Sequence, residues 1–376
     1  MQNNSKSNIV LFGRTGAGKS SFINYLLGSK VAPTGCGEPV TTAFDEYEYA
    51  LENGISIRIF DSKGLEVDGY QDAVDEIIDF VARRNNSNNV LDWMHSVFYC
   101  ININRARLET EEISFINKVV DVIGFPVHII ITHCRSAEST DKEREMQAKI
   151  RAELGESAKV YCVNSVEKRM RTGDIAHQFG RESIISDLVD LLWENTARRI
   201  ASNYATQMRA GLFKIIEGLM TEYFMKINLA KKSNLKAGKI PEFGLDNSAE
   251  ATALFIQEMN ASYSYSINTF LDMYCLFANA LDSGPAKRLS PYSLSYEVLL
   301  DDSLEDELKN WLNKRLSEVS KKKGLEALLD YIDCQLHFRD TFKEPMIFLC
   351  QIMRARVPSH EEIEEDIYKM LLEIKE

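Results

Sequence analysis

The sequence lacks the cysteine spacing of a metal site or a disulfide framework. Its seven cysteines are spread over 376 residues without a CxxC pair, and most lie inside apolar runs. This distribution is typical of reduced, buried thiols in the cytosol. No run approaches the roughly 18 apolar residues of a membrane-spanning helix, and the polar beginning MQNNSKSN has no signal-peptide core. We therefore expect a cytoplasmic protein.

An excess of positive charge is also missing. The net charge is −12. It is shared evenly, because residues 1–200 hold 23 basic and 29 acidic side chains and residues 201–376 hold 21 and 27, which leaves −6 in each part. A protein that binds nucleic acid along its surface usually presents a basic face. The charge distribution therefore makes nucleic acid an unlikely partner. The chain also contains no internal repeat and no low-complexity segment.

Short β-branched and aromatic runs alternate with longer helical patterns up to about residue 200. This alternation predicts an α/β fold with a mostly parallel six-stranded sheet and helices on both faces. The turn signal at Glu52–Gly54 predicts an antiparallel hairpin at one edge of the sheet. The six predicted strands are Asn8–Phe12, Phe44–Leu51, Ile55–Phe60, His95–Ile103, Val127–Thr132 and Lys159–Asn164.

Strand signals stop after residue 200, and helical periodicity takes their place. We therefore predict two domains, 1–200 and an all-α domain over 201–376. Its aromatic and leucine residues recur at the spacing of core packing, although two lysine clusters, Lys226–Lys239 and Lys321–Lys323, leave open a contact with anionic lipid or RNA. The predicted helices are Asn203–Ala230, Ser248–Leu281, Ser303–Ser320, Leu325–Phe338 and His360–Glu376.

The stretch GRTGAGKS matches the pattern GxxxxGK[ST] and lies between a predicted strand and a predicted helix. Glycines let the backbone wrap around a phosphate, so that amide groups and the helix N-terminus face its oxygens. Lys19 adds a point charge at the β- and γ-phosphates, and the Ser20 hydroxyl is a candidate Mg²⁺ ligand. The predicted phosphate-binding residues are Gly13, Arg14, Thr15, Gly16, Ala17, Gly18, Lys19, Ser20 and Ser21.

Two further segments fit the same site. The strand ISIRIF runs into DSKG, 42 residues after Lys19. There Asp61 can hold a Mg²⁺-bound water, and Gly64 can offer its amide to the γ-phosphate. Between these motifs, GCGEPVTTAFDEY contains two threonines, of which we favour Thr41 over Thr42 as the residue that closes over Mg²⁺. The alternative is that both threonines simply begin an edge strand.

With these motifs in place, residues 8–200 resemble a GTPase domain of the translation-factor-related superclass. GEPVTTAFDEY and WMHSVFYCINI are similar to segments of Era-like and septin-like members. The resemblance implies a P-loop GTPase fold with GTP or GDP and Mg²⁺ as cofactors. It covers about half of the chain and implies little about the helical part.

The loop that reads the base departs from this family. Where the family has TKxD, this sequence has Thr132, His133, Cys134 and Arg135. Arginine is only a donor and cannot accept the guanine hydrogen bonds that the aspartate accepts. Three interpretations stay open: His133 lies flat on the base while Glu138 or Asp141 reads its edge, the site also accepts ATP, or the loop is plain surface. Some chloroplast-import receptor GTPases resemble this sequence in having TH at this place, which accompanies the first interpretation. Asn164 and Ser165, in CVNS, resemble the last base-contacting station.

Hydrolysis is expected to be slow, because Leu65 follows DxxG where efficient GTPases often carry a glutamine that orients water. An arginine can compensate for this. Arg107 and Arg105 lie in a segment that resembles the region from which septin-like immune GTPases insert an arginine into a partner's site. The alternative is that they pair with Glu109, Glu111 and Glu112. We count Lys19, Thr41, Gly64, Arg107 and Arg105 as the catalytic candidates.

These observations favour a slow GTPase that acts as a nucleotide-dependent switch or assembles with itself. The predicted partners are a second copy through the GTPase domain, and a membrane surface or protein effector through the helical domain. Two alternatives remain: a nucleotide-binding scaffold with negligible turnover, and an ATPase with relaxed base specificity.

Overall fold

The structure, a computed structural model, describes residues 6–28, 32–33, 38–39, 44–50, 56–62, 70–87, 89–105, 108–136, 140–169, 175–231, 242–280, 289–298, 304, 306–308, 310–311, 314 and 337–375. The chain divides into two compact units. The first comprises Met1–Ala197 and Ser266–Tyr292, and the second Arg198–Tyr265 and Ser293–Glu376.

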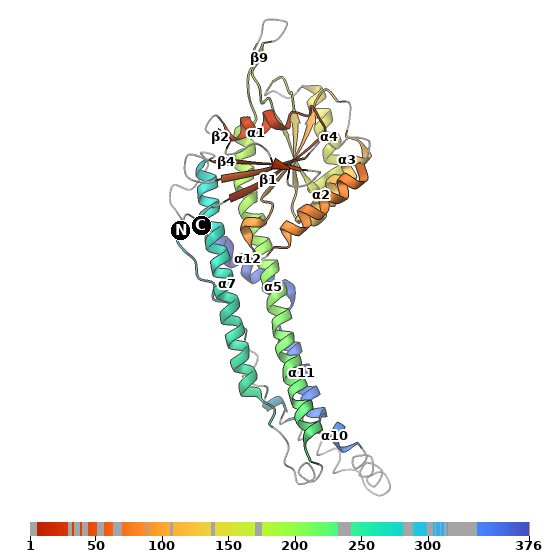
Figure 1. Ribbon diagram of the computed structural model, residues 1–376, viewed down its shortest axis with the longest axis vertical. Coiled ribbons are helices and arrows are strands. Elements are labelled where there is room, and N and C mark those ends of the chain that lie inside the picture. Colours follow the sequence, from red (N-terminus) through yellow and green to blue (C-terminus); the bar gives the residue numbers. More distant parts are fainter. Residues whose placement is uncertain are drawn as a thin grey trace. The chain divides into compact units, whose positions relative to one another are not determined.

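The first unit is built on a mostly parallel sheet (Figure 1). Its six long strands are the six predicted ones, with ends that shift by no more than two residues. The long strands lie in the order β4-β5-β1-β6-β7-β8, and the two-residue strands β2 and β3 pair with β4. β4 runs antiparallel to β5, as the hairpin prediction requires, while the other long neighbours are parallel. The strands are β1 (Lys6–Phe12), β2 (Ala32–Pro33), β3 (Glu38–Pro39), β4 (Phe44–Ala50), β5 (Ser56–Ser62), β6 (Ser96–Asn102), β7 (Val127–Thr132) and β8 (Ala158–Cys162).

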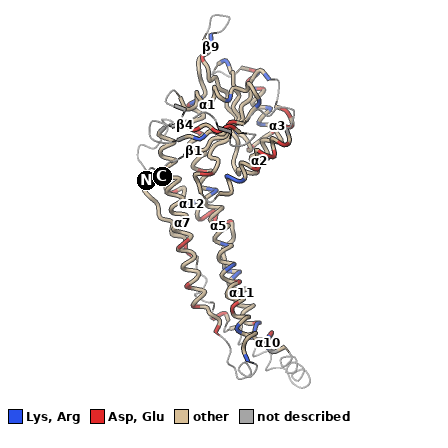
Figure 2. Tube along the Cα trace, in the orientation of Figure 1, with Lys and Arg blue, Asp and Glu red and all other residues tan. Residues whose placement is uncertain are grey.

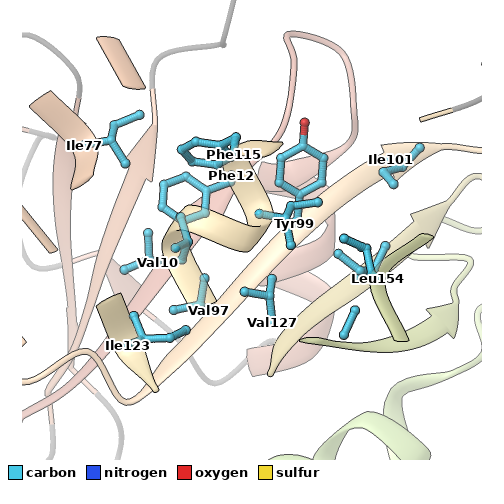
Figure 3. Close-up of a cluster of buried hydrophobic side chains, with 14 of the residues drawn as sticks. Val10, Phe12, Ile77, Val97, Tyr99, Ile101, Phe115, Ile123, Val127 and Leu154 are labelled. Carbon is cyan, nitrogen blue, oxygen red and sulfur yellow. The ribbon is translucent and has the colours of Figure 1, made fainter. Parts of the chain in front are cut away.

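The sheet is covered on both faces, which explains why β6 and β7 are buried along almost their whole length. Alternate residues such as Val10, Val97 and Val127 pack into one core against three helices (Figure 3). On the opposite face, Phe98 meets Phe22 of another helix with ring centroids 5.2 Å apart. The three helices are α2 (Tyr70–Asn85), α3 (Thr110–Ile123) and α4 (Asp141–Leu154), and Phe22 lies on α1 (Lys19–Leu27).

A buried polar network fixes the beginning of the central strand. The Asn8 side chain donates to the carbonyls of Leu91 and Trp93, at 2.8 and 2.7 Å. Its backbone N–H donates to His95 Nδ1, so the other ring nitrogen carries the proton and donates to Val90 O. These bonds tie β1 to the short helix η1 (Val90–Asp92) and to the start of β6. The beginning of the strand that leads into GRTGAGKS is therefore fixed against η1 and β6.

The second unit is helical. It contains the later part of α5 (Arg181–Leu229), the first part of α7 (Leu245–Ala280), and the helices α10 (Phe338–Thr341), α11 (Glu344–Arg356) and α12 (His360–Glu373). Tyr204 packs edge-to-face against Tyr263 and Tyr296, and its hydroxyl donates to Asn260 at 2.6 Å. A capping box of Ser359 and Glu362 begins α12. Aromatic residues at helical spacing thus form core in this unit, as the sequence predicts.

The helical predictions differ from the structure in two places. α5 begins at Arg181, 22 residues before the predicted start at Asn203, so the expected domain boundary after residue 200 falls inside it. α11 was not predicted at all. Parts of the predicted helices Ser303–Ser320 and Leu325–Phe338 lie outside the described residues. No helix of the described residues is long and apolar enough to cross a membrane. Along the described trace, Lys and Arg alternate with Asp and Glu (Figure 2).

Candidate functional site

The loop between β1 and α1 has the backbone of a phosphate cradle. Gly13, Gly16 and Gly18 all have positive φ, at 132°, 74° and 90°. A Cβ at Gly13 would stand 2.4 Å from the carbonyl oxygen of Cys100 on β6, which is too close for any side chain. Glycine is therefore required here both by conformation and by space. The predicted tight wrapping of this loop is what the structure shows.

Lys19 lies at the first position of α1 and points back over the loop. Its Nζ donates to Gly13 O at 2.9 Å and lies 3.9 Å from Asp61 Oδ1 at the end of β5. The two charges that the sequence assigned to phosphate and to Mg²⁺ are thus brought together. Ser20 and Ser21 follow on α1 and are exposed. Thr41 and Gly64, together with Leu65, lie outside the described residues.

Asp61 has the surroundings of a cation ligand. Its Oδ1 is buried without a hydrogen-bond partner, and Asp45 stands directly opposite it on β4. Burial raises the pKa of the Asp61 carboxyl to about 6, and the attraction of Lys19 only partly opposes this. A divalent cation would offset both the cost of burying the Asp61 carboxylate and its repulsion by Asp45. Among the described residues, no group of three or more His, Cys, Asp or Glu side chains could hold a metal ion.

A cavity of about 620 Å³ opens beside the phosphate loop. The predicted base contacts Thr132 and His133 line it together with Gly18, and so do Asn164 and Ser165. Other lining residues were not predicted as contacts, among them Asn104, Arg135, Lys168 and Arg169. The last two lie on β9 (Lys168–Arg169), which pairs with β10 (Ile175–Ala176) in a small hairpin. Its two-residue strands, Lys-Arg and Ile-Ala, are too short to give a periodic signal in the sequence.

Thr132 connects the base loop to the phosphate loop. Its buried hydroxyl lies 2.6 Å from Ala17 O and 2.9 Å from His133 Nδ1. When the hydroxyl donates to Ala17 O, the His133 Nδ1–H donates to the hydroxyl oxygen. Thr132 therefore positions both the imidazole and the turn before Lys19, rather than presenting a free hydroxyl to a base.

His133 holds an unusual backbone conformation. With φ at 61°, it is the non-glycine residue with positive φ among the described part of the chain. Left-handed backbone costs an L-residue roughly 1–2 kcal/mol. The conformation leaves the side chain exposed, with Cε1 3.1 Å from the place of a Cβ on Gly18. An imidazole at this position borders both the phosphate loop and the cavity.

The neighbours of His133 are held by contacts that the sequence did not indicate. Cys134 is 2% exposed, and its N–H donates to Val163 O. The neighbouring Cys162 thiol and burial raise the pKa of Cys134, so it stays protonated. The N–H of Arg135 donates to Glu143 Oε1 at 3.3 Å, and Glu143 also forms the capping box of α4 with Thr140. Buried Glu143 thus supports the base loop from α4.

The other residues proposed to read the base have varied placements. Asn164 donates through Nδ2 to the carbonyls of Ala176 and His177, so its amide holds the β10 segment. Asp141 begins α4, is exposed and pairs with Arg144 at 2.6 Å. Glu138 lies outside the described residues. Three of the described lining residues, Arg135, Lys168 and Arg169, carry cationic donors.

The arginine candidates also have defined places. Arg105 forms ion pairs with Glu112 and Glu109, at 3.0 and 3.4 Å, which is the pairing that the sequence left as the alternative. Arg14 of the phosphate loop pairs with the same two glutamates. Arg107 lies outside the described residues.

Comparison with known proteins agrees with this geometry. Residues 8–164 match the family model described as 50S ribosome-binding GTPase. These residues therefore resemble a P-loop GTPase domain. The matched range ends at Asn164 and includes the phosphate loop, Asp61 and the base loop.

Individual proteins and solved structures also resemble part of this chain. Immune-associated nucleotide-binding protein 10 of Arabidopsis thaliana is 33% identical over 121 residues, which cover 31% of this chain and 24% of that protein. The chain therefore spans about a quarter of that relative. Among solved structures, the G domain of the T. maritima FeoB iron transporter is 16% identical with a TM-score of 0.31. The match covers 50% of this chain and 98% of the FeoB chain. Toc33 of Arabidopsis thaliana, in complex with GDP and Mg²⁺, is 18% identical with a TM-score of 0.35, covering 50% and 84%.

Proposed function

We propose that the protein is a Mg²⁺-dependent GTP-binding protein with slow intrinsic hydrolysis, which acts as a nucleotide-dependent switch or as a GTPase that assembles with itself. The observation that carries this proposal is the cradle at the end of β1. Three glycines with positive φ, the Lys19 ammonium and the buried Asp61 oxygen converge there. Backbone amides, a cation and a metal-ready carboxylate are what a Mg²⁺-triphosphate requires.

Ser20, Thr41 and Asp61 are the proposed metal-holding residues. A bound Mg²⁺ would neutralise charge that develops between the β- and γ-phosphates. The orphaned Oδ1 of Asp61, next to Asp45, is the feature of this chain that fits the ion. Lys19 would exchange its bond to Gly13 O for phosphate oxygens, and Gly64 would donate its amide to the γ-phosphate. Together these groups would orient the phosphates.

Hydrolysis is proposed to be slow in the single chain and faster in a pair of chains. Leu65 has no group that can orient water, so the missing stabilisation has to come from a cation. We propose Arg105 or Arg107 in this role, supplied to a second copy, since an arginine that reaches the transferring phosphate contributes about 10³–10⁵ in rate. We further propose that the helical part contacts a protein effector or a membrane surface, and that the protein acts in the cytoplasm.

The base loop supports a second candidate function. Arg135 occupies the position of the aspartate acceptor, and the described lining of the cavity is rich in donors. Hydrogen bonds to a charged acceptor contribute roughly 1.5–3 kcal/mol each, so their loss favours an ATPase or a nucleotide-binding scaffold with relaxed base choice. GTP remains the first proposal, with His133 against the base and Thr132, Asn164 and Ser165 around it.

Calorimetric titration with GTP and with ATP, each with Mg²⁺, tests both candidates. The expected result is heat with GTP, weaker heat with ATP, and loss of both in Lys19→Ala. Equal affinities would favour relaxed base choice. No binding by the parent protein would contradict the whole proposal. Phosphate release measured over a range of protein concentrations then separates a GTPase from a scaffold, because a scaffold releases none.

A further inference from the structure

Two arginines and two glutamates form a charge cluster at the start of α3. Arg14 belongs to the phosphate loop and Arg105 follows β6, while Glu109 and Glu112 are the N-cap and third residues of α3. Arg14 Nη2 contacts Glu109 Oε2, and its Nε lies 3.5 Å from Glu112 Oε1. Arg105 contacts Glu112 Oε1 at 3.0 Å and Glu109 Oε1 at 3.4 Å. Each arginine therefore touches both carboxylates.

Glu112 is the buried centre of this cluster. Its side chain is 0% exposed, and it also accepts bonds from the Tyr99 hydroxyl at 2.7 Å and the Glu109 N–H at 2.9 Å. Tyr99 extends from the core of the sheet with its hydroxyl at the margin (Figure 3). A buried carboxylate is costly unless opposite charge compensates it. Glu112 therefore has to keep at least one arginine close.

The two arginines compete for the same acceptors. Glu112 Oε1 accepts from Arg105 and Tyr99, which uses both of its lone pairs and leaves Arg14 Nε, 3.5 Å away, without a hydrogen bond. Burial alone would lower the pKa of the Arg14 guanidinium, but the bond to Glu109 and the attraction of Glu112 raise it above its ordinary value. If one arginine binds the Glu109 and Glu112 carboxylates more strongly, the other arginine is held more weakly.

We propose that Glu109 and Glu112 form a latch that holds Arg105 back from a second copy of the chain, and that Arg14 opens this latch by competing for the same carboxylates. The proposal rests on the proposed function, in which Arg105 acts on the nucleotide of a second copy. It makes Glu109, Glu112 and Arg14 positioning residues rather than catalytic residues. Because Arg14 belongs to the phosphate loop, a nucleotide that shifts this loop also changes the hold on Arg105.

The first test measures the latch without using activity. Phenylglyoxal modifies accessible guanidinium groups, and peptide mass spectrometry gives the rate at Arg105 separately from other arginines. Glu109→Gln removes one acceptor charge at a position that is 40% exposed, so the fold should tolerate it. We expect Arg105 to react about fivefold faster in this variant, the factor that corresponds to about 1 kcal/mol for a partly exposed ion pair. Arg14→Gln should slow Arg105 below the parent rate, because both carboxylates then serve Arg105 alone.

A matched control is Glu145→Gln on α4, which removes an equal charge from the surface pair with Lys149. In this variant, phenylglyoxal should modify Arg105 at the same rate as in the parent. Equal Arg105 rates in the parent, Glu109→Gln and Arg14→Gln would overturn the latch. A faster rate in Arg14→Gln would overturn the competition, since it would show that Arg14 helps to hold Arg105 in place.

The second test connects the latch to turnover in the full chain. Glu109→Gln should reach half of its maximal specific activity at a protein concentration about fivefold below that of the parent, and Arg14→Gln at a higher concentration. Unchanged midpoints in both variants would overturn the regulatory part of the proposal. If the parent neither binds nor hydrolyses GTP, the proposed function fails, whereas unequal Arg105 modification rates would still support the shared hold.

Discussion

His133 shows how one residue combines strain and position. Its φ of 61° places the imidazole beside Gly18 and within bonding distance of Thr132. Asparagine tolerates left-handed backbone better than most residues, and β-branched side chains tolerate it poorly. The backbone and the ring of His133 can therefore be tested separately by two substitutions.

We expect His133→Asn to leave the free energy of unfolding within about 0.5 kcal/mol of the parent, whereas His133→Val should lose about 1–2 kcal/mol. GTP affinity should fall about fivefold in His133→Asn, because an aromatic contact contributes about 0.5–1.5 kcal/mol. Chemical unfolding and fluorescent-nucleotide titration measure the two effects. Unchanged affinity in His133→Asn would show that the ring does not touch the base.

His128 is a buried titratable group within β7. Its ring lies between Phe98 and Tyr161, with centroid distances of 5.2 and 5.9 Å. Burial lowers the pKa of His128 to about 4, and the attraction of Asp187 opposes this only in part. In the unfolded chain the imidazole binds its proton near its ordinary pKa of about 6.5. Between these values the unfolded state binds more protons, so stability is present above pH 6.5 and is lost as the pH falls toward 4.

The expected loss from His128 alone is about 3 kcal/mol as an order of magnitude. His128→Phe should remove this part of the acid sensitivity, since the aromatic packing remains without the proton site. Urea unfolding at several pH values between 4 and 7 measures it. The control is His177→Gln, because His177 is 75% exposed and should not alter the pH profile in this way. An identical acid slope in His128→Phe and the parent would contradict the prediction.

The sequence predicted the residues of the site better than their contacts. The motif located Lys19 and Asp61, and the pairing of β1 with β5 brings them together. The role of Thr132 as a tie to Ala17 O has no signal in the sequence, because it depends on a bond across 115 residues. For Arg105, the pattern NRARLETEE left two options open, and only the fold shows that Glu112 is buried beneath it.

At the scale of elements, the strands were easier to predict than the helices. A strand buried on both faces is a short apolar run between turns, which the sequence shows directly. The prediction missed the early start of α5 because it placed a domain boundary near residue 200, although residues 181–202 contain no glycine or proline that would break a helix. α11 was not predicted, although its one proline, Pro345, lies in the first turn, where a helix tolerates proline.

Gly211 and Gly218 on α5 provide a matched pair within one helix. A Cβ at Gly211 would stand 2.0 Å from the ring of Phe255 on α7, whereas nothing lies within 4 Å of a Cβ at Gly218. Alanine is favoured over glycine by about 0.5–1 kcal/mol in a helix. We therefore expect Gly218→Ala to stabilise the protein by about that amount.

Gly211→Ala should instead destabilise it by about 1–3 kcal/mol, because the ring and helix backbone have to move. Thermal and urea unfolding of the two variants measure the difference. The gain from Gly218→Ala serves as the internal reference for helix propensity. Similar stabilisation by both substitutions would show that the Phe255 ring moves away at no cost.

At the scale of the molecule, the residues of the phosphate and base sites all belong to the first unit. A ligand that binds the folded state stabilises it in proportion to the logarithm of its concentration. Mg²⁺-GTP at 100 times its dissociation constant should therefore add about 2.7 kcal/mol to the stability of the unit that binds it.

Differential scanning calorimetry with and without Mg²⁺-GTP measures this effect. Lys19→Ala should melt like the parent without ligand and show no shift with it. GTP without Mg²⁺ should shift the transition less, since Asp61 then lacks its counter-ion. A shift of equal size in Lys19→Ala would place the nucleotide elsewhere on the chain.

The division of the whole chain was the least accessible to sequence patterns. A change from strand to helix signals predicts one domain boundary near residue 200. The first compact unit also includes the later segment Ser266–Tyr292. Trp193 explains part of this, since its ring meets Phe270 and Tyr274 of α7, at 5.4 and 4.8 Å. Contacts between residues about 80 apart follow from packing and leave no local mark in the sequence. The boundary at residue 200 therefore stays a prediction.

The buried thiol of Cys134 can report how often the base loop opens. A protonated sulfur that is 2% exposed cannot meet an alkylating reagent until the loop swings open. When the reagent is concentrated enough that alkylation is faster than reclosing, the alkylation rate of Cys134 equals the rate at which the loop opens. A bound purine that contacts His133 should lengthen the interval between these openings.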